Sequence, residues 1–306
     1  IATKNSWIGM AGPAMIEGGG LGKFDPKEIG PSDIQKNNGV IDYVAEDEKE
    51  ATIIAKKILS YFQGDIKDWK ADDQTQLSNI MPKDRRWSYP VRDIIKIISD
   101  IEEFTEIKPE YGKGIVTCFI RIEGKPFGLL ANDSQHLGGA IDSEGADKAS
   151  SFIEMCSEYG LPIISLVDTP GFMVGPDSEK EGAVRRMSNL FKIGSKVKVP
   201  LTAIFLRKGY GLGAQAMVGG SLHEPVYTAA WPTGEFGAMG LEGAVKLGFK
   251  KELEKIEDNS KREELFNSLV EKLYDKGKAI EAAAHLEIDA VINPSETRSV
   301  ILKSQK

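Results

Sequence analysis

Histidine and cysteine are scarce in this sequence. Its 306 residues include two cysteines, Cys118 and Cys156, and three histidines, His136, His223 and His285. The cysteines have no CxxC spacing and lie among apolar residues, which favours buried thiols in a reducing compartment over a disulfide framework or a zinc site. The histidines fall in neither triad nor metal-binding spacing. We therefore expect no metal in this chain.

Long apolar runs and an excess of basic residues are also absent. No stretch of 18 apolar residues and no signal-like start occur, so we expect neither a membrane span nor secretion. The net charge of -7 and a pI near 5.3 argue against a nucleic-acid or anionic-membrane partner. We expect a cytoplasmic protein, or a mitochondrial matrix protein if the source is eukaryotic. The chain starts without methionine, apparently inside a strand, which predicts a fragment of a longer polypeptide.

A glycine-rich turn between a strand and a helix organises the rest of the chain. Residues 199–206 are continuously apolar and predict a buried strand. Glycines at 209, 211 and 213 follow, and then the helix-forming run 214–218. Glycine lets a backbone approach a ligand closely, and the first amides of a helix have no partner within it. Such a turn can hold a developing oxyanion, or it can be a tight connection with no ligand.

Strand and helix patterns alternate along the chain, which predicts an α/β fold. Residues 9–22 predict a packed turn with a short helix, and the polar stretch 63–90 predicts an interdomain linker. A capping box at 178–181 predicts the start of one helix. The remaining expected strands cover residues 39–44, 114–122, 126–132, 161–167, 227–231 and 235–240, and the helices cover 47–62, 91–104, about 143–156, 178–191 and about 250–276.

The chain also echoes itself. Residues 2–12 resemble residues 230–240 at one constant offset, because Ala2, Gly9 and Gly12 have counterparts in Ala230, Gly237 and Gly240. Residues 41–44 (IDYV) resemble residues 288–291 (IDAV) in the same order along the chain. Two echoes in one order predict a duplicated fold, with most of the first copy lying upstream of Ile1.

Several motifs together carry a family resemblance. They are Leu137-Gly138-Gly139-Ala140-Ile141-Asp142 with Ala146-Asp147-Lys148-Ala149, Leu166-Val167-Asp168-Thr169-Pro170-Gly171-Phe172, Ala230-Trp231-Pro232-Thr233, and the segment 288–298. In this order they resemble the carboxyltransferase subunits of biotin-dependent acyl-CoA carboxylases and decarboxylases, such as the propionyl-CoA and acetyl-CoA carboxylases. The resemblance covers about residues 7–300.

The resemblance implies a crotonase-like (ClpP/crotonase) α/β fold of ββα superhelical type. Residues 1–62 would be the C-terminal part of a first crotonase-like domain. Residues 63–104 would be the linker and connecting helix, and residues 105–306 a complete carboxyltransferase domain. Family members divide their labour: the N-terminal domain of one subunit binds acyl-CoA, and the C-terminal domain of a neighbouring subunit receives carboxybiotin.

The resemblance also implies a mechanism and partners. Backbone amides of Gly211, Leu212 and Gly213 would form the oxyanion hole for the ureido oxygen of biotin, and biotin itself would remove the α-proton of a short acyl-CoA. Leu212 stands where the family usually has glycine, so its side chain must point away from the ligand. Biotin would arrive on a separate carrier protein. The expected partners are the biotin carboxyl carrier protein, the biotin carboxylase subunit, and further copies of this chain as dimers that assemble into a hexamer.

The same resemblance assigns further site residues. Gly138, Gly139, Gly171, Phe172 and Ala214 would line the biotin site, although loop geometry and core packing explain these positions equally well. Gln215 occupies the position that selects the acyl chain. Gly9 and Gly12 would be remnants of the acyl-CoA half, or simply structural turns. The segment 30–35 departs from the family pattern, which leaves the substrate open.

Other functions remain open. An enoyl-CoA hydratase or isomerase of the same superfamily would need a glutamate over its substrate, for which Glu235 and Glu242 are the candidates. A catalytically silent assembly module is a second alternative. Asp168 to Phe172 also resembles the DxPG of GTPases, but no GxxxxGK[ST] motif accompanies it. The sequence does not determine the acyl-CoA, the direction of reaction, the oligomer number or whether this chain is active without the missing half.

Overall fold

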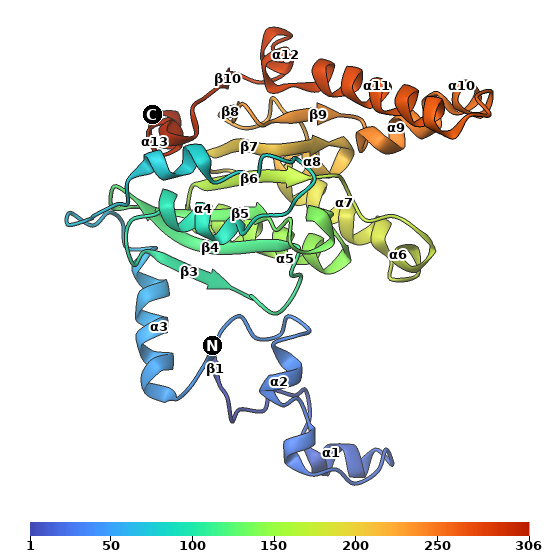
Figure 1. The fold of residues 1–306 in the computed structure, drawn as a ribbon. Coiled ribbons are helices and arrows are strands. Elements are labelled where there is room, and N and C mark those ends of the chain that lie inside the picture. The colour runs from blue at the N-terminus through green and yellow to red at the C-terminus, as the bar shows by residue number, and fades with distance from the viewer. Residues whose placement is uncertain (306) are drawn as a thin grey trace.

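One mixed sheet forms the centre of the molecule. The computed structural model describes residues 1–305 and shows eight strands in the order β10-β8-β7-β6-β5-β4-β3, with β9 paired to the end of β7 (Figure 1). The strands are β3 (Phe104–Ile107), β4 (Ile115–Ile122), β5 (Lys125–Asn132), β6 (Ile163–Thr169), β7 (Leu201–Tyr210), β8 (Tyr227–Ala230), β9 (Glu235–Gly237) and β10 (Ala290–Val291).

The middle strands are buried on both faces, as their apolar sequences predict. Every residue of β4 and β6 is buried. Strands β3, β4 and β5 are antiparallel neighbours, and β5, β6, β7 and β8 run parallel. Parallel neighbours need long crossover connections, and the intervening helices supply them. The alternation of strands and helices confirms the predicted α/β class.

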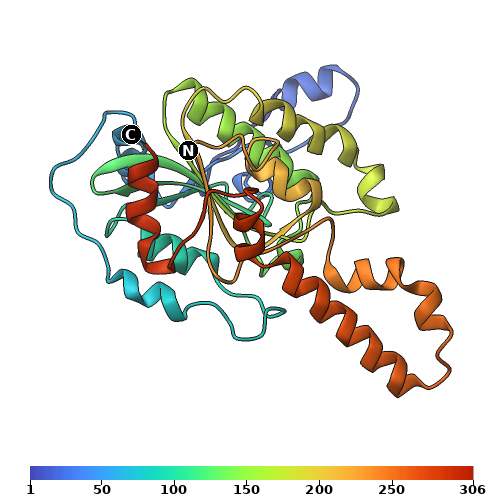
Figure 2. The same ribbon diagram turned by 90° about the horizontal axis from the view of Figure 1, so that it is seen from above.

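Helices cover both faces of this sheet. On one face α5 (Ser143–Glu158), α7 (Ala183–Gly194) and α8 (Gly211–Met217) pack into one apolar cluster. On the other face α4 (Val91–Ile98) and α13 (Thr297–Ser304) pack into a second cluster around Trp231. The C-terminal ends of the parallel strands are thereby held between two packed layers; Figure 1 looks onto the sheet, and Figure 2 looks along it, with helices on either side.

The first 62 residues form a separate lobe beside β3 (Figure 1). It contains β1 (Ala2–Thr3), β2 (Val44–Ala45), α1 (Pro13–Gly18), α2 (Ser32–Gln35) and α3 (Glu48–Ser60). Asp47 caps α3 by accepting a hydrogen bond from the Glu50 amide. The expected packing of residues 9–22 is wrong, because α1 has no buried residue and Met10 and Met15 are fully or largely exposed.

The internal echo of the sequence has a structural counterpart. Ala2 pairs with Val44 in the parallel pair β1–β2, and Ala230 pairs with Val291 in the parallel pair β8–β10. These are the residues that the two sequence echoes align with each other. The same cross-strand register therefore occurs twice.

The expected boundaries fail in several places. The strand expected over 39–44 is present only as β2, and the strand expected over 235–240 ends at Gly237. Helix α4 ends at Ile98 and is followed by strand β3, so residues 91–104 are not one helix. Residues 178–181 do not cap a helix: α6 (Pro176–Lys180) begins after Gly175, and α7 begins after the left-handed Gly182. The charged helix expected over 250–276 is divided into α10 (Lys250–Glu254) and α11 (Asn259–Gly277), because Asp258 caps a new helix.

An exposed arm of helices, the short helix α12 and one buried 3-10 segment complete the fold. Helices α9 (Leu241–Gly248), α10 and α11 extend from the sheet as an arm, and α12 (Ala279–Ala284) returns the chain to β10 (Figure 2). The 3-10 segment 74–79 carries the fully buried Leu77, so the expected linker contributes to the core. Across residues 1–305, no helix is both long and apolar enough to cross a membrane.

Candidate active site

Three loops meet at the C-terminal ends of β5, β6 and β7. They approach so closely that their glycines leave no room for side chains. A Cβ on Gly213 would lie 2.6 Å from the carbonyl carbon of Gly171, and one on Gly139 would lie 2.3 Å from the carbonyl oxygen of Asp168. The Ile141 amide donates to the Gly171 carbonyl at 3.0 Å, which joins the first two loops. The structure therefore brings Gly139, Gly171 and Gly213 together.

The turn from β7 into α8 leaves backbone amides available. Gly211 has a left-handed φ of +60°, and a Cβ there would meet the Ala238 carbonyl oxygen at 2.8 Å. No side chain caps α8, and within residues 1–305 the amides of Leu212 and Gly213 donate to no protein acceptor. The Leu212 side chain is 64% exposed and so lies outside the packed turn. Two amides at one tight turn can hold an oxyanion.

A cavity of about 500 Å³ adjoins this turn. Its lining includes Gly211, Ala214 and Gln215 from the turn and α8, and Phe236 from β9. Charged side chains of the α11–α12 region complete the lining. The predicted acyl-selecting residue and the predicted amide turn thus share one cavity. An apolar hollow beneath α3 contains none of the predicted site residues.

The other predicted site residues lie in different environments, and not all of them are near the turn. Gly138 has a φ of +64° and open space around it, as a loop that faces a ligand would have. Phe172 is half-buried and its ring packs on Phe191 at a centroid distance of 6.1 Å, so core packing accounts for it. Gly9 and Gly12 lie beside α1 in the first lobe, far from α8 (Figure 1). The chain does not bring them to the turn.

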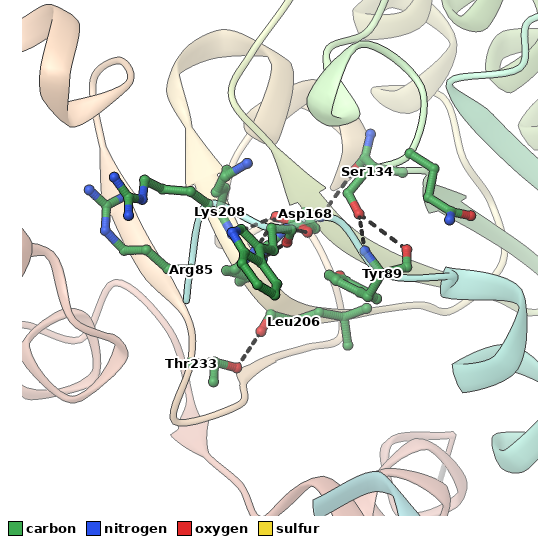
Figure 3. A network of polar contacts seen from close by, with 12 residues as sticks. Arg85, Tyr89, Ser134, Asp168, Leu206, Lys208 and Thr233 are labelled. Carbon is green, nitrogen blue, oxygen red and sulfur yellow. Dashed lines mark hydrogen bonds and ion pairs between the residues drawn. The ribbon is translucent and has the colours of Figure 1, made fainter. Parts of the chain in front are cut away.

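Sequence reasoning missed a buried ion pair directly behind the turn. The Arg207 guanidinium donates to the Asp168 carboxylate at 2.9 Å, and both side chains are buried. The Lys208 amide donates to the other carboxylate oxygen at 3.0 Å, as the close-up of Figure 3 shows. Arg207 also donates to the Trp87 carbonyl and lies 4.9 Å from the Tyr89 ring centroid. The segment that was expected to be a linker therefore anchors the ends of β6 and β7.

A second polar cluster lies on the other side of the same strand end. Glu235 is 1% exposed, and neither of its carboxylate oxygens has a hydrogen-bond partner within residues 1–305. Burial raises its pKa, and the nearby Arg85 opposes that shift. Arg85 lies 3.6 Å from Glu235 and donates to Glu242 at 2.7 Å. Arg85 lies outside the sequence motifs that carry the family resemblance.

The described part of the chain contains no cluster of metal-ligating side chains. No group of three His, Cys, Asp or Glu side chains within residues 1–305 is arranged to hold a metal ion. The two free cysteines are both buried, and burial raises the pKa of each thiol.

The fold and the glycine-lined strand ends define a crotonase-like α/β protein, in which the amide turn after β7 adjoins a cavity. The chain belongs to the carboxyl transferase domain family, whose pattern it matches over residues 1–306.

Relatives of known structure and function share this domain. A single-chain, multi-domain long-chain acyl-CoA carboxylase is 51% identical, with a TM-score of 0.92 over 98% of this chain and 30% of that one. The methylmalonyl-CoA carboxyltransferase 12S subunit of Propionibacterium freudenreichii subsp. shermanii is 32% identical over 98% of this chain. The hexameric transcarboxylase 12S structure with methylmalonyl-CoA bound has a TM-score of 0.86 at 30% identity. The chain spans 59% of the length of the 12S subunit.

Proposed function

We propose that this chain is part of a carboxyltransferase that moves a carboxyl group between carboxybiotin, held on a separate carrier protein, and the α-carbon of an acyl-CoA. The observation that carries the proposal is the pair of unpartnered amides at Leu212 and Gly213, beside the cavity lined by Gly211 and Gln215. Membership of the carboxyl transferase family supports the same reaction class.

The residues present fit a biotin ureido group. The amides of Leu212 and Gly213 would donate to its oxygen, and Gly138, which has open space around it, would let the ring approach the backbone. When bound, the biotin group carries the carboxyl and supplies the acceptor nitrogen. The chain contributes fixed N–H donors that stabilise negative charge on the oxygen, and each such donor lowers the barrier by roughly 3–4 kcal/mol in known enzymes.

The division into domains is also a proposal. We infer that residues 1–62 end a first crotonase-like unit, residues 63–104 connect the units, and residues 105–306 form the second. The matched register of the pairs Ala2–Val44 and Ala230–Val291 supports a duplicated fold. The burial of Leu77 and Ile94 against the sheet supports counting the connecting segment as structurally part of the second unit.

The names of the relatives support proposals for the assembly and for the acyl group of the substrate. The 12S transcarboxylase is described as a hexamer, and we propose that the subunit containing this chain also forms dimers that assemble into a hexamer. The biotin carboxyl carrier protein and the biotin carboxylase are its proposed partners in the cytoplasm or the mitochondrial matrix. Either the short methylmalonyl group of one relative or the long acyl chain of another is a candidate substrate, with Gln215 lining the cavity that would select between them.

The test is carboxyl transfer to free biocytin. Malonyl-, methylmalonyl- and glutaconyl-CoA would be offered in parallel to this chain and to the full-length subunit that contains it. Activity in the full-length subunit alone would place the acyl-CoA site in the part outside this chain. If both proteins were folded and neither transferred the carboxyl group, the carboxyltransferase reading would fail and a silent assembly module would be favoured.

The hydratase alternative loses support from the positions of its two candidate acids. Glu235 is enclosed and is not among the residues that line the cavity, and Glu242 is engaged by Arg85. A general acid or base must come within about 2.6–3.2 Å of the proton that it transfers. Hydration of an enoyl-CoA by the full-length subunit would reverse this conclusion.

A further inference from the structure

Glu235 is deeply buried beside Tyr210. Within residues 1–305 neither of its carboxylate oxygens accepts a well-aligned hydrogen bond, although the Tyr210 hydroxyl lies near enough to lower the pKa of the carboxylate. Burying a carboxylate is costly, and unpaired buried polar atoms are rare in native proteins. Burial raises the pKa of Glu235, and burial followed by the charge of Glu235 raises the pKa of Tyr210. The chain therefore keeps an ionisable group where an apolar or amide side chain would be less costly.

The position of Glu235 gives a reason for keeping it. Strand β9 pairs with the last residues of β7, with Glu235 opposite Lys208 and Gly237 opposite Tyr210. Tyr210 is the residue before Gly211, where the amide turn begins. The backbone of residue 238 also approaches Gly211, because a Cβ there would lie 2.8 Å from the Ala238 oxygen. Strand β9 therefore fixes the point at which β7 becomes the turn.

Arg85 ties this strand to the segment before the sheet. Its guanidinium lies 3.6 Å from Glu235, donates to Glu242 on α9 at 2.7 Å, and lies 5.5 Å from the Tyr274 ring centroid on α11. Three charged groups from other segments lie near the Glu235 carboxylate: Arg85, Lys208 and Asp168. Glu242 is linked to it indirectly, through its ion pair with Arg85. Arg85 is the only one of them that forms an ion pair with Glu235 in the described part of the chain.

We propose that Glu235 is a positioning residue for the amide turn, held by Arg85 on one side and set against Tyr210 on the other. It is not among the residues that line the cavity. Its charge fixes the end of β7, and with it the direction in which the amides of Leu212 and Gly213 point. Any effect of Glu235 on catalysis rests on the proposed carboxyl transfer. Its role in positioning the end of β7 does not depend on that function.

Amide hydrogen exchange tests the structural role without any activity assay. Glu235→Gln keeps the size of the side chain and removes its charge, and Arg85→Gln removes the partner. We expect each variant to exchange the amides of residues 208–210, the last residues of β7, at least tenfold faster than the parent chain, with the β4–β5 hairpin unchanged. The double variant should exchange no faster than the faster single variant, because both changes remove one interaction. Unchanged exchange over 208–210 in both single variants would overturn the proposal.

Two further measurements separate positioning from simple stabilisation. Because the buried carboxylate is itself unfavourable, Glu235→Gln should leave the melting temperature unchanged or higher, while kcat for transfer to biocytin by the full-length subunit falls at least tenfold with little change in KM. A parallel fall in melting temperature and in kcat would indicate a merely structural residue and overturn the proposal. Glu263→Gln makes the same chemical change on the exposed face of α11 and should alter neither quantity.

The outcomes also distinguish this inference from the proposed function. Faster exchange at 208–210 with full activity would show that Glu235 positions the turn but that the turn is not the catalytic element. That result would refute the catalytic half of the inference together with the oxyanion assignment. No activity in the parent subunit would refute the proposed function, and the exchange result would still decide the structural role of Glu235.

Discussion

Asp168 and Arg207 form a buried ion pair that joins the end of β6 to the end of β7. Their side chains are 0% and 3% exposed, and the carboxylate and guanidinium lie 2.9 Å apart. The carboxylate also accepts from the Lys208 amide, so the pair fixes the backbone that leads into the amide turn. Removing one partner of such a pair leaves a buried charge uncompensated.

Asp168→Ala should therefore destabilise the fold strongly. We expect a loss of about 3–5 kcal/mol in the free energy of unfolding, measured by urea titration. The matched control is Asp147→Ala, which breaks the Asp147–Arg186 pair at 3.0 Å, where both side chains are about one-third exposed. That change should cost about 0–1 kcal/mol. Equal losses of unfolding free energy in the two variants would show that burial does not make the Asp168–Arg207 pair more important for stability.

Gly213→Ala should abolish most transfer activity. Even one methyl group there would lie 2.6 Å from the Gly171 carbonyl carbon, so two backbone segments must separate. Displacing one oxyanion donor typically lowers kcat by about 10²–10³. Gly248→Ala is the control, since a Cβ in that helical position meets nothing within 4 Å. Biocytin carboxylation by the full-length subunit measures both, and full activity in Gly213→Ala would remove this turn from the mechanism.

Leu212→Ala should leave both stability and transfer nearly unchanged. The side chain is 64% exposed at the start of α8, so its removal exposes little new surface. We expect less than about 0.5 kcal/mol change in unfolding free energy. We also expect kcat within about twofold, because only the amide faces the proposed ligand. A tenfold change in KM for the acyl-CoA would instead show that the leucine side chain contacts substrate.

Lys148 should make stability rise with pH above neutrality. It is 2% exposed on α5, and its ammonium has no hydrogen-bond partner within residues 1–305. Burial lowers its pKa from 10.5 to about 8. Between these values the unfolded chain holds the proton and the folded chain has released it, so stability increases as pH rises from about 8 to 10.5.

The lowered pKa of Lys148 also sets the size of this pH effect. The difference between 10.5 and about 8 corresponds to about 3 kcal/mol in the free energy of unfolding, as an order of magnitude. Lys148→Met should flatten this part of the stability–pH curve and raise stability at pH 7, whereas Lys180→Met, at a position 76% exposed, should do neither. Guanidinium unfolding at several pH values provides the curve. A parent curve as flat as that of Lys148→Met would show that the lysine is solvated.

The strands and the site glycines were predictable from the sequence, whereas the side-chain networks were not. Apolar runs specify buried strands because both faces of the sheet are covered, so β4 to β7 were found within a few residues. The turn at Gly211 was found because its glycines follow such a strand. Its neighbours Gly139 and Gly171 were named from the family resemblance, and the structure brings them beside Gly213.

What remained hidden depends on contacts between distant segments. Arg85 lies in a polar stretch with no periodicity, so its contact with Glu235, 150 residues later in the chain (235 minus 85), leaves no local pattern. The break between α10 and α11 was missed because charge is continuous across it and only the cap at Asp258 marks the new start. The exposure of Met10 and Met15 was missed because apolar composition predicts packing without saying what the residues pack against.

The connectivity of the sheet also has a consequence for how the chain folds. Strands β4 and β5 are joined by the two-residue turn Glu123–Gly124, so their contacts close over a very short loop. The β8–β10 pair closes a much longer loop, because Val291 lies 61 positions beyond its partner Ala230 (291 minus 230). Loop closure is slower for distant partners. Pulse-labelled refolding should therefore protect the β4–β5 amides first, and earlier protection of β8 and β10 would contradict this order.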